Sequence, residues 1–130
     1  MKTHQFITAG PALPPLASPI SHAVVAGAHC YISGQLALDA TGAFRSGTAR
    51  EEAALAFQNL FAVAEAAGFE RHEIVYVDLA FADLADLGEV NALYAELFPE
   101  GRRPARTIYQ AAALPSGARI KVQAVAVRAH

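Results

Sequence analysis

The chain has 130 residues, of which 54% are hydrophobic and 17% are charged, a composition that excludes a disordered or fibrous protein and suits one globular domain over residues 1–130. The formal net charge of −2, without a basic stripe, argues against a nucleic-acid partner. The single cysteine excludes an internal disulfide and fits a reducing compartment, and no apolar run approaches the roughly 20 residues that cross a bilayer. We therefore expect a cytoplasmic protein without a membrane segment.

The N-terminal part of the chain is predicted to form an arm and a hairpin. Residues 1–19 are rich in proline, which cannot donate hydrogen bonds to a sheet, so this arm should be extended with at most a short edge strand. The apolar runs 23–25 and 29–33, joined by a turn at Gly27, have the pattern of a β-hairpin. Residues 39–47 have the composition of a turn.

A helix is predicted to begin at Thr48, because Glu51 three residues later completes a capping box. Gly68 is its expected C-cap. Between them, apolar residues recur at helical spacing at Phe57, Leu60, Phe61, Ala64 and Ala67. The mostly apolar segment 73–82 that follows is typical of a central strand.

A second helix and two strands are predicted in the last third of the chain. Asp86 is the expected N-cap of this helix, and Pro99 follows its end. Its inward stripe consists of Val90, Leu93, Tyr94 and Leu97. The segments 105–112 and 118–128 are predicted strands, separated by a Pro-Ser-Gly turn.

The predicted order of elements is ββαβαββ, which favours an α+β fold with a mixed sheet and both helices packed on one face. The other face of such a sheet must also be covered. A chain of this length has no further element to cover it, so we expect burial against other subunits.

The sequence lacks most signatures of nucleotide, metal and nucleophile sites. It contains neither GxGxxG nor GxxxxGK[ST], its five histidines include no H-x-x-x-H pair, and G-x-S-x-G is absent. Cys30 lies in an apolar strand, where a cysteine is usually inert core. We therefore expect no metal site.

Arg106 is the candidate ligand-binding residue. It falls within a predicted strand, where alternation places it on the same side as Ile108 and Gln110. Its planar guanidinium matches a carboxylate with two parallel hydrogen bonds, which favours a small organic acid as ligand. A structural ion pair with Asp78, with Asp83 or with a partner subunit is the alternative interpretation.

Several short motifs follow one another along nearly the whole chain, from about Pro19 to Arg128. They are Ser33-Gly34-Gln35-Leu36, Asn59-Leu60, Glu65-Ala66-Ala67-Gly68, Val90-Asn91-Ala92-Leu93-Tyr94, Pro104-Ala105-Arg106-Thr107, Leu114-Pro115 and Gln123-Ala124-Val125-Ala126-Val127. Each motif alone is weak. Together and in order, they resemble the RidA (YjgF) family of imine-hydrolysing, endoribonuclease L-PSP-like proteins.

This resemblance implies a chorismate-mutase-like fold, a homotrimer with clefts between subunits, and no cofactor. It also implies hydrolytic deamination of reactive enamines and imines, of the 2-aminoacrylate, 2-iminopropanoate and 2-iminobutanoate type, to 2-oxo acids and ammonia. By position, Arg106 would hold the substrate carboxylate. The backbone of Gly34 and Ile108 would line the site, and Ser33 and Asn91 would support it.

Three positions depart from the family pattern. Gln123 stands where the active branch has a glutamate that positions the attacking water, and glutamine can orient water but cannot accept a proton. Loss of a general base typically costs about 10²–10⁴ in rate. Ile20 stands where the family has a tyrosine, and Ile108 where it often has a cysteine. The expected activity is therefore a slow or altered imine deaminase.

Two other functions compete with this interpretation. The same cleft could bind a 2-oxo acid without turnover, and the changes at Gln123, Ile20 and Ile108 favour this non-catalytic reading. Some relatives are described as ribonucleases or translation inhibitors. The net charge of −2 and the lack of a histidine pair argue against this third function.

Overall fold

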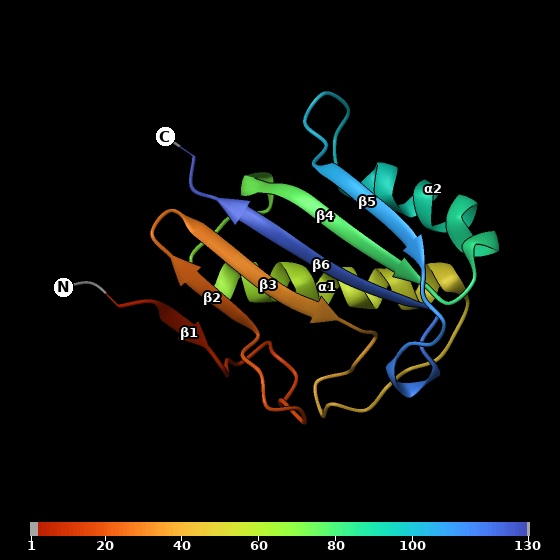
Figure 1. Cartoon of the computed structure of the whole chain (residues 1–130), viewed down its shortest axis with the longest axis horizontal. Coiled ribbons are helices and arrows are strands. Elements are labelled where there is room, and N and C mark those ends of the chain that lie inside the picture. Colours follow the sequence, from red (N-terminus) through yellow and green to blue (C-terminus); the bar gives the residue numbers. More distant parts are fainter. Residues whose placement is uncertain (1–2, 130) are drawn as a thin grey trace.

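A computed structural model describes residues 3–129 as a six-stranded sheet with two long helices. The elements in chain order are β1 Gln5–Ile7, β2 Ala23–Ala26, β3 His29–Gln35, α1 Ala49–Ala66, β4 Ile74–Phe81, α2 Leu87–Leu97, β5 Ala105–Gln110 and β6 Ile120–Val127. The predicted ββαβαββ order is confirmed from β2 onward (Figure 1). β1 is the short edge strand that the sequence analysis allowed within the proline-rich arm.

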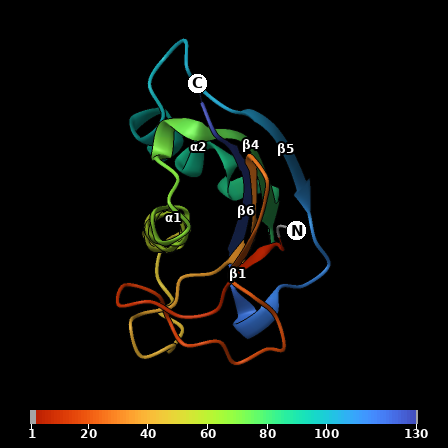
Figure 2. The ribbon, with the colours of Figure 1, turned by 90° about the vertical axis from the view of Figure 1, so that its left-hand side faces the viewer.

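The sheet is mixed, with the strand order β1-β2-β3-β6-β4-β5. β4 and β5 are parallel and all other neighbours are antiparallel. Figure 2 shows α1 and α2 on the same side of the sheet, as predicted. Within residues 3–129 no helix or strand covers the opposite side, which we call the open face. Phe6 and Tyr31 expose 60% and 52% of their surface there.

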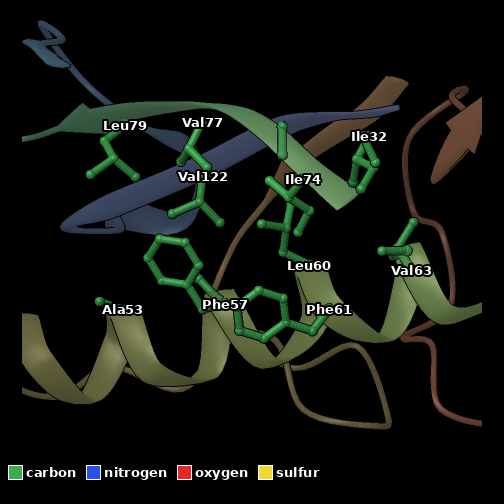
Figure 3. Packing of buried hydrophobic residues seen from close by; sticks show 14 of the residues in the cluster. Ile32, Ala53, Phe57, Leu60, Phe61, Val63, Ile74, Val77, Leu79 and Val122 are labelled. Carbon is green, nitrogen blue, oxygen red and sulfur yellow. The ribbon is translucent and has the colours of Figure 1, made fainter. Parts of the chain in front are cut away.

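The helix α1 follows from local sequence. The Thr48 side chain accepts a hydrogen bond from the backbone N–H of Glu51, whose own side chain accepts one from the N–H of Thr48. At the other end Gly68 has a φ of 85°, a left-handed conformation that favours glycine. The apolar face of α1 packs against the sheet, where Phe57 and Leu60 are fully buried (Figure 3).

The predicted N-cap of the second helix, Asp86, is confirmed in position but not as a side-chain cap. Asp86 makes no side-chain capping bond. A short 3-10 turn at Leu84–Asp86 precedes α2, and Asp83 caps that turn by accepting from the N–H of Ala85 at 2.9 Å. Asp86 instead lies 3.5 Å from the guanidinium of Arg119. Neither helix has the length and apolarity needed to cross a membrane within the described residues.

Candidate functional site

Arg106 lies on the helix side of β5, where α2 fixes its side chain. Its Nη1 donates to Oδ1 of Asn91 at 2.8 Å, and its guanidinium carbon lies 4.6 Å from the ring centroid of Tyr94. Both partners are uncharged, and no carboxylate pairs with Arg106 in residues 3–129. The ion pair with Asp78 or Asp83 that the sequence left open does not form within the chain.

A hollow of about 420 Å³ opens beside this guanidinium. It is lined by Asn91, Tyr94, Ala95, Arg103, Pro104 and Arg106. The hydroxyl of Tyr94 is buried and has no hydrogen-bond partner among residues 3–129. Burial raises the pKa of this phenol, although Arg106 opposes the shift. Tyr94 was predicted only as a core residue of α2, and it also supports the candidate site. Ile108, two residues along β5, packs against the core on the same side.

Ile20, Ser33 and Gly34 line a second hollow of about 490 Å³ between the N-terminal arm and the end of β3. Ser33 donates its hydroxyl to the carbonyl of Ser21 at 2.6 Å, which holds the arm beside the strand. Gly34 lies at a bulge where β3 changes register against β6. A Cβ at Gly34 would come within 2.8 Å of the Cδ of Lys121. Lys121 therefore lines the site, although the sequence analysis did not select it.

Gln123 lies on the open face, because its neighbours Val122 and Ala124 on β6 are buried toward α1. Its Cα partner on β4 is Asp78. Oδ1 of Asp78 is buried and has no hydrogen-bond partner in the described chain. The predicted water-binding glutamine is thus directly opposite a carboxylate that no sequence motif had indicated.

The structure separates the predicted site residues into two groups. Arg106, Asn91 and Ile108 lie on the helix side of the sheet, whereas Gln123 lies on the open face and Ser33 beside the arm. A sheet is one backbone layer thick, and side chains on its two faces point away from each other. A single copy of the chain therefore does not bring Arg106 and Gln123 to the same small molecule.

The remaining candidates carry no chemistry of their own. Cys30 is fully buried, and burial raises the pKa of its thiol to about 11, so the thiol is uncharged and unreactive near neutral pH, as expected for a core cysteine. Within residues 3–129 no three His, Cys, Asp or Glu side chains gather into a metal-binding group.

Comparison with known proteins gives consistent matches over nearly the whole chain. The family model "Endoribonuclease L-PSP" matches residues 12–128. A mouse protein named 2-iminobutanoate/2-iminopropanoate deaminase is 40% identical over 116 residues, which are 88% of this chain and 85% of the relative. The human protein of the same name is 40% identical over 111 residues, covering 85% of this chain and 80% of its own.

Solved structures match the fold closely. RidA from the Antarctic bacterium Psychrobacter has a TM-score of 0.89 and 32% identity, over 95% of this chain and 99% of its own. Escherichia coli TdcF, solved with bound serine, has a TM-score of 0.87 and 27% identity, over 96% of this chain and all of its own. The α+β architecture with its mixed sheet and two helices is the one these relatives share.

Proposed function

The chain belongs to the RidA/YjgF family, also called endoribonuclease L-PSP, and from this membership we propose that it hydrolyses 2-imino acids and their enamine forms to 2-oxo acids and ammonia. Substrates of the 2-iminopropanoate and 2-iminobutanoate type follow from the names of its relatives. The observation that carries the proposal is a guanidinium, that of Arg106, which lies beside a hollow without a counter-charge in the described residues.

Arg106 anchors the substrate carboxylate in this proposal. Asn91 occupies one N–H of the guanidinium and Tyr94 supports its face, so the group is oriented before a ligand arrives. The remaining N–H donors form a planar fork that suits a carboxylate. Because neither partner is charged, an incoming anion does not have to displace an internal ion pair.

The second group completes the site around the reacting carbon. Gln123 orients a water molecule through its amide. The backbone of Gly34 lines the space around the imine, together with the backbone of Ile108 from the Arg106 group. Ser33 holds the arm, and Ile20, which is 51% exposed, offers an apolar contact to the substrate side chain. A protonated imine is already electrophilic, so placing water against it supplies most of the acceleration.

The site is proposed to form between subunits of a homotrimer. The support is geometric, because the Arg106 group and the Gln123 group lie on opposite sides of one sheet. Two copies can present both groups to one molecule if the helix side of β5 in one meets the open face of the next. Such packing also covers the exposed Phe6, Tyr31 and Tyr109.

The test is an imine-hydrolysis assay. An L-amino-acid oxidase releases 2-iminopropanoate or 2-iminobutanoate, semicarbazide competes for the imine, and formation of the 2-oxo acid is followed with time. We expect the protein to suppress semicarbazone formation and to speed release of the 2-oxo acid in proportion to its concentration. No acceleration over buffer with several amino acids would exclude the deaminase function.

A second candidate function is binding of a 2-oxo acid without turnover. The observation that favours it is Gln123 itself, since an amide cannot take a proton from water. Titration calorimetry with 2-oxobutanoate, run beside the rate assay, separates the two functions. Binding with no acceleration supports the non-catalytic function, whereas binding together with acceleration supports the enzyme.

A further inference from the structure

Lys121 brings a positive charge to the hollow between the N-terminal arm and the end of β3. The residue is half-buried in β6 and lines this hollow of about 490 Å³ together with Ile20, Ser33 and Gly34. No Asp or Glu side chain of residues 3–129 lines the hollow, and none forms a salt bridge with Lys121. A hollow with one sign of charge and no counter-charge favours an anionic ligand.

The stem of Lys121 is positioned by its packing on Gly34. A Cβ at Gly34 would lie 2.8 Å from Cδ of Lys121, so any larger residue there would force the stem to move. Glycine in a strand is typical of such a close approach. The stem thus crosses from β6 to β3 and reaches the residues that line the hollow.

Ser116 adds a second polar group to the same hollow, from a strained backbone. It lies in the 3-10 turn Pro115–Gly117, has a φ of 61° and is the only residue other than glycine with a positive φ in the described chain. Such strain gathers at ligand-binding sites, and a serine hydroxyl can donate to a carboxylate. His22, the other basic side chain that lines the hollow, is buried, and its Nε2 lies 2.8 Å from the carbonyl oxygen of Pro14. Lys121 is therefore the cation that a ligand can reach.

Two separate cations suit two anionic groups in one ligand. Arg106 lies on the helix side of β5, whereas Lys121 lies on the open face, because its neighbours Ile120 and Val122 are buried toward α1. In a site shared between two copies of the chain, a monocarboxylate pairs with one of these cations and leaves the other without a partner. A dicarboxylate forms a charge-assisted hydrogen bond with each of them.

We propose that Lys121, with Ser116, binds a second carboxylate, so that the preferred substrates are the imines of dicarboxylic amino acids, such as 2-iminoglutarate. This inference rests on the proposed deaminase function and narrows its substrate class. Arg106 of another copy holds the carboxylate next to the imine carbon, and Lys121 holds the carboxylate at the far end of the side chain. The exposed side chain of Ile20 contacts the methylene groups between them.

Two five-carbon 2-oxo acids provide the test, because 2-oxoglutarate has a carboxylate where 2-oxopentanoate has its terminal methyl group. Calorimetry should show that the wild type binds 2-oxoglutarate about tenfold more tightly, the low end for a hydrogen bond between charged groups, since Lys121 is only half-buried. Lys121→Met keeps an unbranched stem but removes the charge, so the ratio of the two affinities should fall to about one. Lys121→Glu should invert the preference.

Arg50→Met is the matched control. It removes the same formal charge from an exposed position on α1, where Arg50 pairs with Glu96, and should leave the affinity ratio at the wild-type value. A ratio near one in the wild type, or a preference for 2-oxoglutarate that survives Lys121→Met, overturns the inference. If Lys121 paired with a carboxylate of another subunit, Lys121→Met would weaken the oligomer in size-exclusion chromatography without changing the ratio, which also overturns it.

The imine-hydrolysis assay keeps this inference apart from the deaminase function. An L-glutamate oxidase supplies 2-iminoglutarate, and an L-amino-acid oxidase supplies the neutral imine of norvaline. The wild-type kcat/KM should be about tenfold higher for 2-iminoglutarate. Hydrolysis of the neutral imine with an equal or higher kcat/KM overturns the role of Lys121 and leaves the deaminase function intact. Preferential binding of 2-oxoglutarate without hydrolysis of either imine overturns the deaminase function but not the recognition of charge by Lys121.

Discussion

Replacing Arg106 with alanine tests the anchor on which the proposed function depends. A hydrogen bond between charged groups contributes about 1.5–3 kcal/mol. For two such bonds to a guanidinium that is only half-buried, solvent screening lowers the sum to about 3 kcal/mol. Since 1.4 kcal/mol corresponds to a factor of ten, Arg106→Ala should weaken 2-oxobutanoate binding and lower kcat/KM by about 100-fold. Calorimetry and the semicarbazide competition assay measure the two quantities separately.

Stability must be followed in the same variant. Arg106→Ala removes one hydrogen bond to Asn91 and the contact with the Tyr94 ring, which together contribute about 1–2 kcal/mol to the free energy of unfolding. A urea melt should therefore show a folded, slightly weaker protein. Arg102→Ala, at an exposed loop position nearby, is the matched control and should leave binding unchanged. Binding that survives in Arg106→Ala while stability falls would mean that Arg106 is a structural residue.

Two further predictions follow from local contacts. Gly34→Ala places a methyl group against the flexible stem of Lys121, so the fold should persist while the stem moves into the hollow. Binding of 2-oxobutanoate should then weaken about fivefold, roughly 1 kcal/mol. Unchanged affinity by calorimetry would contradict this prediction. Burial raises the pKa of the Cys30 thiol from 9.0 to about 11. As the pH rises, the thiol therefore ionises in the unfolded chain before it does so in the folded protein. The contribution of the buried thiol to the free energy of unfolding is complete below pH 9 and declines toward pH 11. Urea melts across this range should show that decline in the wild type but not in Cys30→Ala.

The sequence predicts well where neighbouring residues decide the structure. The start of α1 depends on Thr48 and Glu51, three residues apart, and its end depends on Gly68, so all three could be recognised from the sequence. The N-cap position of α2 at Asp86 was also predicted correctly, but the contact that its side chain makes was not. Asp83 and Asp86 are both suitable capping residues. The 3-10 turn Leu84–Asp86, which no sequence pattern predicted, is capped by the Asp83 side chain, whereas the Asp86 side chain lies beside Arg119.

The rest of the site depends on pairing between distant strands. Asp78 and Gln123 become neighbours only because β6 inserts between β3 and β4 in the sheet. Side-chain alternation along β4 places Asp78 on one face but does not say which strand lies beside it. The place of Lys121 beside the hollow was not predicted for the same reason, because its contact with Gly34 joins β6 to β3. Arg106 was found because its motif is local, whereas its support by Tyr94 comes from a separate element.

The opposite placement of the two groups makes a strong prediction about mixed oligomers. Arg106→Ala damages the helix-side group, and Gln123→Ala damages the open-face group. If each site takes one group from each of two copies, a cyclic oligomer assembled at random from equal amounts of the two variants contains about one intact site in four. Coexpression of the two inactive variants should therefore restore about a quarter of the wild-type rate.

The control for this experiment is each variant expressed alone, which has no intact site and should stay inactive. Combining the separately purified variants without subunit exchange should likewise restore nothing, because their copies never share a cleft. If both groups acted from the same protomer, every chain would carry one damaged group and coexpression would also restore nothing. Recovery on coexpression alone thus requires that Arg106 and Gln123 of different copies meet at one substrate.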